Sequence, residues 1–105
     1  MAISNTELTT SLGNIYVSSG ASVVSVMYFC NHDGSARDFS LYAVPSTVDL
    51  ANVGTDQQIY RNVQVASDDT FVVDMEKLVL ADGDYLVANA SANTAFAVTV
   101  SYTGI

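Results

Sequence analysis

The sequence contains three consecutive segments, Ser22-Val-Val-Ser-Val-Met-Tyr-Phe-Cys30, Asn31-His-Asp-Gly-Ser-Ala-Arg-Asp38 and Phe39-Ser-Leu-Tyr-Ala-Val44, which hold its densest apolar material. The first and third are rich in valine and aromatic residues, which favour the pleated geometry of β-strands. The second is polar and contains a glycine, as connections between strands often do. Pro45 follows the third segment and is typical of the end of a strand. We therefore predict a β-hairpin at the centre of the fold.

The first of these strands has apolar residues on both faces. Because side chains alternate along a strand, we predict one face with Val24, Val26, Tyr28 and Cys30 and another with Val23, Met27 and Phe29. Such a strand is buried on both sides, or has one side in the core and the other against a partner. We expect the hairpin to form the core. If its second face lies outside the core, that face would be a docking surface.

The rest of the chain supplies further strand signals separated by turn residues. Apolar or alternating runs occur at 14–17, 59–66, 70–74, 85–90 and 95–102. Residues 1–12 are predicted to form a weak strand or an extended N-terminal arm, and residues 46–56 an irregular excursion. About seven or eight strands at this spacing, without alternating helices, are typical of sandwiches and barrels. We therefore predict an all-β fold: a single antiparallel β-sandwich, jelly-roll or immunoglobulin-like, with residues 1–105 as one domain.

Acidic residues outnumber basic ones in this chain. Eleven Asp and Glu residues stand against three Lys and Arg residues, for a net charge of −8 at pH 7. Nucleic acids and anionic membranes attract clustered Lys and Arg, so we expect neither as a partner. The N-terminus lacks the basic and apolar regions of a secretory signal, and the run Val23–Cys30 is too short to span a bilayer as a helix. We therefore expect synthesis and residence in a cytoplasm.

Cys30 and His32 are the only cysteine and the only histidine of the sequence. A nucleophilic cysteine needs an imidazole within hydrogen-bond reach and a third group that orients this base. Because the strand is predicted to break at Asn31, we interpret Cys30 as a small core residue and His32 as a solvated loop residue. The sequence therefore predicts no catalytic residues and no enzyme activity.

Two pairs of carboxylates lie in predicted turns, Asp68-Asp69 and Asp82 with Asp84. Aspartate is favoured in turns because its side chain accepts hydrogen bonds from nearby backbone N–H groups. The alternative is a surface calcium site built from loop oxygens, although the spacing does not match an EF-hand loop. We predict turn residues here, and neither a metal site nor a cofactor site in the chain.

The order of several short segments is a further feature of the chain. These segments are Asn14-Ile-Tyr-Val17, Ser18-Ser-Gly20, Phe29-Cys-Asn31, Ser35-Ala-Arg37, Leu41-Tyr-Ala-Val-Pro45, Lys77-Leu-Val-Leu-Ala-Asp-Gly-Asp84 and Val98-Thr-Val-Ser-Tyr-Thr-Gly-Ile105. Together they resemble small structural proteins of tailed bacteriophages, in strand and turn pattern rather than in a chemical motif. The resemblance implies a non-enzymatic virion component: a capsid cement or decoration subunit that binds a major capsid protein, or a tail, neck or baseplate accessory that binds tail proteins.

The resemblance also implies a homo-oligomer located in the virion after synthesis in the host cytoplasm. The alternative from another functional class is a carbohydrate-binding or receptor-binding β domain that uses exposed tyrosines. As interface residues we predict apolar side chains in the terminal segments, which the core pattern does not obviously require: Ile3, Leu8, Leu12, Tyr102 and Ile105. The competing interpretation is that the same residues complete strands of the core.

Overall fold

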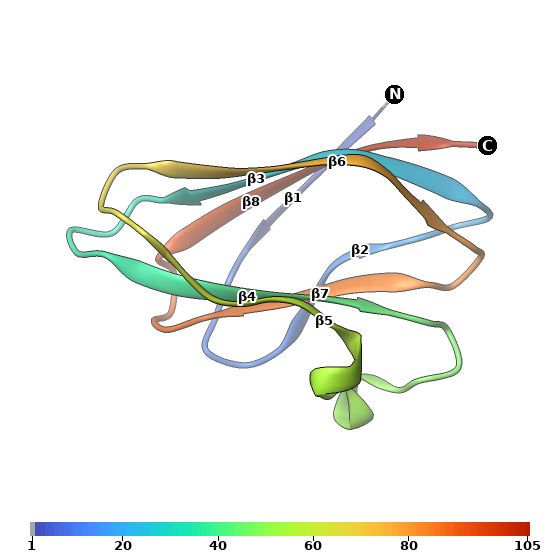
Figure 1. The fold of residues 1–105 in the computed structure, drawn as a ribbon, viewed down its shortest axis with the longest axis horizontal. Helices are drawn as coiled ribbons and strands as arrows, with labels where there is room; N and C mark the ends of the chain where they lie inside the picture. Colours follow the sequence, from blue (N-terminus) through green and yellow to red (C-terminus); the bar gives the residue numbers. More distant parts are fainter. Residues whose placement is uncertain (1) are drawn as a thin grey trace.

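Eight β-strands and two short 3-10 turns make up a computed structural model of the chain, which describes residues 2–74 and 78–105 (Figure 1). The strands are β1 (Ala2–Glu7), β2 (Gly13–Val17), β3 (Ser22–Asn31), β4 (Arg37–Val44), β5 (Gln58–Val65), β6 (Thr70–Leu80), β7 (Tyr85–Ala90) and β8 (Phe96–Gly104). The turns η1 (Leu50–Asn52) and η2 (Thr55–Gln57) lie between β4 and β5. The prediction of an all-β chain is confirmed.

The strands form two four-stranded antiparallel sheets that pack face to face. Sheet A has the order β1-β8-β3-β6 and sheet B the order β2-β7-β4-β5. The first half of the chain pairs with the second half in reverse order, β1 with β8, β2 with β7, β3 with β6 and β4 with β5. A long two-stranded ribbon rolled in this way is a jelly roll, the double Greek-key sandwich. The predicted β-sandwich is confirmed, in its jelly-roll form.

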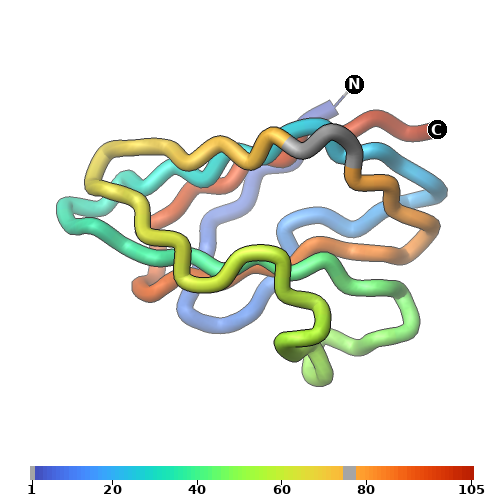
Figure 2. The backbone as a smooth tube through the Cα atoms, in the orientation of Figure 1, coloured from blue at the N-terminus to red at the C-terminus, as the bar shows by residue number. Residues whose placement is uncertain are grey.

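The predicted central hairpin is wrong, although its two strands begin and end close to where we expected. β3 lies in sheet A between β8 and β6, and β4 lies in sheet B between β7 and β5. The chain crosses from one layer to the other after Asn31 (Figure 2). The two strands therefore face each other across the core, where the rings of Phe29 and Phe39 stack with centroids 4.0 Å apart. Their high apolar content reflects this facing position, not a shared edge.

The predicted faces of β3 are also wrong, because a β-bulge shifts its register between Val24 and Val26. A bulge adds one residue and reverses which positions point inward. Met27 and Phe29 are fully buried beyond the bulge, on the same side as Val24 before it. Tyr28 is exposed on the opposite side. The face that points away from the core therefore carries Val23, Val26, Tyr28 and Cys30.

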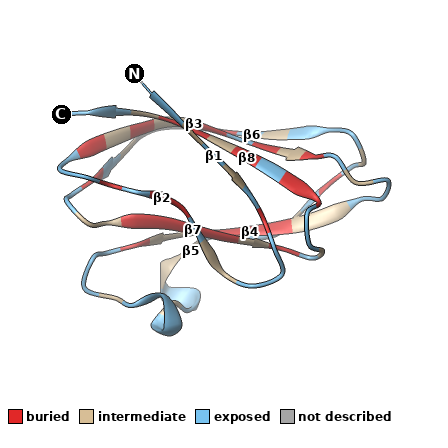
Figure 3. Ribbon diagram, turned by 180° about the vertical axis from the view of Figure 1, so that it is seen from behind, coloured by how far each residue is buried: buried red, intermediate tan, exposed pale blue. Residues whose placement is uncertain are grey.

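The main core fills the space between the sheets. An aromatic cluster lies at its centre, with Phe39 stacked on Phe29 and in contact with Phe71 and Phe96. A second, smaller cluster lies on the outer face of sheet B and consists of Val44, Tyr85 and Val87 with Leu12, Tyr42, Val48 and Val53 around them. Val48 and Val53 belong to the predicted excursion, residues 46–56, which lies within the connection 45–57 that folds over this end of sheet B (Figure 3).

Candidate interaction surface

The outer faces of the two sheets differ in what covers them. Residues 45–57 cover one end of sheet B, where the hydroxyl of Tyr85 also donates a hydrogen bond to the carbonyl of Val48. The other end of that face is polar and includes Ser40, Asn62 and Asn89. No described segment lies over the outer face of sheet A, whose strands show exposed residues in Figure 3.

Apolar side chains gather on this uncovered face of sheet A. Among the described residues, four of the eight exposed large apolar side chains lie there: Ile3, Tyr28, Val72 and Val79. The register places Tyr28 beside Val72 and Val23 beside Val79 on the neighbouring strands β3 and β6. Val26 and Cys30 complete the row of β3 and are half-buried. We call Ile3, Val23, Val26, Tyr28, Val72 and Val79 the outer patch.

Polar groups border the outer patch on the β1 side. A shallow hollow of about 260 Å³ is lined by Asn5, Thr6, Glu7, Ala97, Val98 and Thr99. The hydroxyl of Thr99 donates a 2.9 Å hydrogen bond to Oδ1 of Asn5, which fixes one side of the hollow. Tyr28 is the register partner of Thr99, so the hollow opens next to the apolar residues. The surface is thus apolar in its middle and polar at one edge.

The charges on sheet A are mainly negative. Its four strands contain the acidic residues Glu7, Asp74 and Glu76 and one basic residue, Lys77. Residues 76 and 77 lie outside the described side chains, whereas Glu7 and Asp74 are exposed. The two arginines belong to strands of sheet B, Arg37 to β4 and Arg61 to β5. Such a face suits contact with an apolar surface that also carries positive charge.

Among the described residues, no hydrogen bond joins the side chains of Cys30 and His32. β3 ends at Asn31, and His32 begins the loop with its backbone N–H donating a 2.9 Å hydrogen bond to the carbonyl of Ala95. The imidazole is exposed, and its Nε2 lies 3.7 Å from Oε1 of Glu7. The prediction of a solvated loop histidine is confirmed. Cys30 lies half-buried on the outer face of sheet A, not in the core as we predicted.

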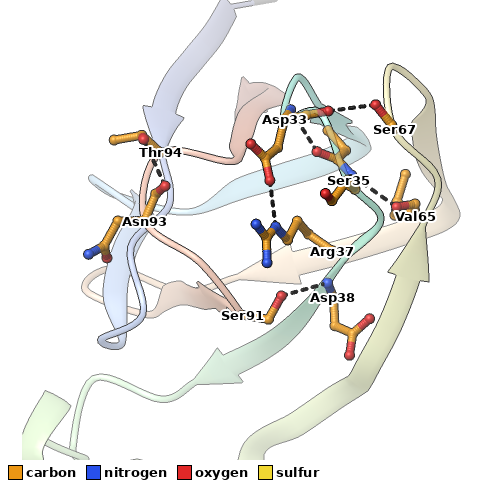
Figure 4. Close-up of polar contacts among 10 residues, drawn as sticks. Asp33, Ser35, Arg37, Asp38, Val65, Ser67, Ser91, Asn93 and Thr94 are labelled. Carbon is orange, nitrogen blue, oxygen red and sulfur yellow. Dashed lines mark hydrogen bonds and ion pairs between the residues drawn. The ribbon is translucent and has the colours of Figure 1, made fainter.

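The loop after β3 is held by hydrogen bonds in which Asp33, Ser35, Val65 and Ser67 take part (Figure 4). The side-chain amide of Asn31 donates to the carbonyls of Ser35 and Val65, at 3.0 and 2.9 Å, and its Oδ1 accepts a 2.9 Å hydrogen bond from the N–H of Asp33. The hydroxyl of Ser67 donates to the carbonyl of Asp33. These bonds connect the loops that follow β3 and β5, so this end of the sandwich is closed by specific contacts.

The same loop contains a carboxyl group, that of Asp33, whose pKa is shifted by its neighbours. Nε of Arg37 donates to Oδ2 of Asp33 at 2.5 Å. This hydrogen bond, together with that from the N–H of Gly34, lowers the pKa of the Asp33 carboxyl below its ordinary value. Both side chains are partly exposed, and the ion pair joins the loop to the first residue of β4, which helps to order the loop.

The carboxylates of the predicted turns bind backbone N–H groups, as expected of turn residues. Oδ1 of Asp82 accepts from the N–H of Gly20, and the two oxygens of Asp84 accept from Ser46 and Ala81 at 3.0 and 2.9 Å. Among the described residues, no three His, Cys, Asp or Glu side chains are grouped in a way that could hold a metal ion. The interpretation of these aspartates as turn residues is confirmed.

The five predicted interface residues lie in different surroundings. Leu8 is buried in the main core, and Leu12 is half-buried against the second cluster. The ring of Tyr102 packs against Tyr16 with centroids 4.3 Å apart, at the margin of the main core. Ile3 and Ile105 are exposed, to 63% and 75%. Residues 2–7 form the edge strand β1 instead of a free arm, so Leu8 and Tyr102 complete the core, while Ile3 joins the outer patch.

Sequence reasoning missed four members of the outer patch, Val26, Tyr28, Val72 and Val79, and named Val23 only in an alternative docking face with Met27 and Phe29. Tyr28 and Val26 were placed on a face with Val24 because the bulge in β3 has no local signature in the sequence. Val72 and Val79 belong to β6, where consecutive apolar residues such as Val72 and Val73 show that both faces of the strand are apolar. That two-sided pattern was the available signal.

One small pocket lies on the outer face of sheet B. It has a volume of about 70 Å³ and is lined by Asp38, Phe39, Ser40, Asn62, Asn89, Ala90 and Ser91. Pockets that bind small organic ligands have volumes of roughly 300–1,000 Å³. This pocket is therefore the size of a water site, and it gives no specific support to carbohydrate binding.

Fold and surface together define a small acidic jelly-roll domain with one uncovered apolar face. Comparisons with protein-family models, with curated proteins and with solved structures gave no significant match. In the described part of the chain, no helix has the length and apolar character needed to cross a membrane.

Proposed function

We propose that this protein is a non-enzymatic structural subunit of a bacteriophage virion, and specifically a capsid cement or decoration subunit that binds and stabilises the shell. The observation that carries the proposal is the outer patch on sheet A, because monomeric proteins rarely leave a contiguous apolar face uncovered unless it is used for binding. The partner would be another virion protein, such as the major capsid protein.

The architecture and the sequence resemblance support the same proposal. Jelly rolls form viral capsid proteins as well as lectins and cupins, so the fold is compatible with a shell protein but does not select one function. Among these classes, the resemblance of the strand and turn pattern to phage structural proteins favours the virion. A chain with a net charge of −8 is also suited to a surface exposed at high density, because self-repulsion keeps unassembled copies soluble.

A tail, neck or baseplate accessory is the alternative position within the virion. Both positions would use a docking face, so they differ in copy number. A shell carries many repeated sites, whereas a tail ring with closed cyclic symmetry carries about six or about twelve. Isotope-dilution mass spectrometry on purified particles, with the major capsid protein as the internal standard, measures this number.

The expected result is a copy number in the hundreds per particle. A value near six or twelve would replace the capsid position with the tail position. Absence of the chain from particles that are purified by two orthogonal methods would overturn the virion proposal itself. Binding of the isolated chain to glycans or host cells, together with absence from particles, would establish the receptor-binding alternative.

A further inference from the structure

We propose that the outer face of sheet A docks on a different protein whose surface is apolar in the middle and bordered by lysine or arginine. This inference deepens the proposed function, since it names the face and the chemistry of its partner. It rests on the virion proposal only where virus particles serve as the probe.

The size of the face is sufficient for a specific interface. Sheet A has four strands, the longest described ones with nine or ten residues. With strands about 4.8 Å apart and a rise of about 3.3 Å per residue, the face measures on the order of 600 Å². Contact with a partner face of equal area would bury about 1,200 Å², the lower limit of standard protein–protein interfaces.

Tyr28 and Val72 lie where such an interface would concentrate its binding energy. They are register partners on adjacent strands, and they are exposed to 42% and 48%. Aromatic residues near the centre of an interface supply a large share of the binding energy when they become desolvated. Two residues further along the same strands, Val26 is paired with Asp74. This pair places a carboxylate directly beside the apolar centre.

The charges disfavour a second copy of this chain as the occupant. In an interface with two-fold symmetry, the same surface meets itself. Among the described residues of the sheet A strands, the charged ones are Glu7 and Asp74, both acidic and exposed, so two copies would bring carboxylates together. Burying carboxylates without opposite charges is costly. A partner with lysine or arginine opposite Asp74 and Glu7 removes this cost, and its positive surface would also accelerate encounter with a chain of −8.

The test uses two valines that match in exposure but lie on different sheets. Val72 on β6 is 48% exposed and belongs to the outer patch, whereas Val17 on β2 is 49% exposed and belongs to sheet B. Purified wild-type chain, Val72→Asp and Val17→Asp are added to particles assembled without this chain, and bound copies are counted after sedimentation. Thermal unfolding of each variant confirms that it is folded before it is used.

We expect Val72→Asp to lower the bound copies at equal concentration by about ten-fold or more, and Val17→Asp to change them by less than about two-fold. A second pair tests the charge. Asp74→Lys is expected to weaken binding more than Asp56→Lys, since Asp56 is exposed in η2 near sheet B. Equal losses within either pair, or wild-type binding by Val72→Asp, would overturn the proposed face.

A random-peptide display selection on the immobilised chain decides the question without particles. We expect the enriched peptides to combine apolar and basic residues, to lose binding to Val72→Asp and to retain binding to Val17→Asp. Peptides that bind both variants equally would overturn the inference. If the peptides discriminate between the two variants but the wild-type chain does not bind particles, only the virion proposal would be overturned.

Sedimentation equilibrium of the purified chain addresses the second-copy alternative. We expect Val72→Asp to leave the oligomeric state of the wild-type chain unchanged, because sheet A meets a different protein. A wild-type dimer that Val72→Asp dissociates and Val17→Asp preserves would show that a second copy occupies the face, and would overturn the proposed partner chemistry.

Discussion

Asn31 is the residue whose replacement tests the structure most directly, because a single buried side chain connects two loops. Its amide donates to the carbonyls of Ser35 and Val65, and its Oδ1 accepts from Asp33. The side chain is fully buried, so water cannot replace it without a change in packing. In Asn31→Ala, both carbonyls and the N–H of Asp33 lose this partner.

The expected loss follows from the number of hydrogen bonds. Each contributes about 1 kcal/mol net, and the cost rises where a partner is left buried and unsatisfied, so Asn31→Ala should lower the free energy of unfolding by about 3 kcal/mol. For a chain of 105 residues, this loss corresponds to a decrease in Tm of roughly 14 °C. Asn93→Ala is the control, since the exposed Asn93 accepts one bond from the N–H of Thr10. We expect it to cost less than about 1 kcal/mol.

Urea denaturation followed by circular dichroism measures both variants. A loss below about 1 kcal/mol for Asn31→Ala would refute the assigned role, since it would mean that the loops close without this side chain. Asn31→Asp keeps the shape but points oxygen at two carbonyls. Burial should raise the pKa of the new carboxyl above its unfolded value, so the folded state binds more protons and the variant gains stability relative to wild type as the pH falls from 7 towards 4.

Two further perturbations test the turn and the ion pair. Gly83 has a φ of +85°, and an added Cβ would lie 3.0 Å from Cβ of Ser46, whereas Gly20 has a φ of +71° and open space around it. We therefore expect Gly83→Ala to lower the free energy of unfolding, measured by urea titration, more than Gly20→Ala does. The Gly20→Ala variant should cost about 1–2 kcal/mol. Arg37 lowers the pKa of Asp33, so the ion pair stabilises the fold above the ordinary pKa of aspartate and this contribution is lost as the pH falls through the lowered value. Asp33→Asn removes the titrating group. We therefore expect the Tm of this variant to decline less than that of the wild type on acidification below pH of about 4.

The strands could be predicted from the sequence far better than their partners could. Length, β-branched content and flanking turn residues are local properties, and they placed the strands around Phe29 and Phe39 correctly. Pairing depends on which strand edges remain free after the whole chain has rolled up. β3 lies between β8 and β6, and β4 lies between β7 and β5, so neither strand has an edge free for the other; the short connection between them resembles a hairpin loop but joins two layers.

The candidate surface was harder to predict than the strands because one extra residue in β3, at the bulge, decides which side chains reach that surface. Without the bulge, strict alternation would place Met27 and Phe29 on the other face of β3 from Val24. With the bulge, all three side chains point into the core and Tyr28 points outward. A bulge arises from the fit of neighbouring strands, which a single strand's sequence does not contain. The terminal residues show the same dependence on context, since Leu8 is buried only because β1 pairs with β8.

The uncovered face of sheet A follows from the topology of the chain. Each connection joins a strand of one sheet to a strand of the other, except the connection from β4 to β5, which stays within sheet B. That connection, residues 45–57, is also the longest, and it has the length to fold back over its own sheet and bury Val48 and Val53. Sheet A has no connection of this kind, so no segment between its strands is available to cover Tyr28 and its neighbours. Among the described residues, no segment of the rolled ribbon covers the outer patch, and this supports the proposal that the patch binds a partner.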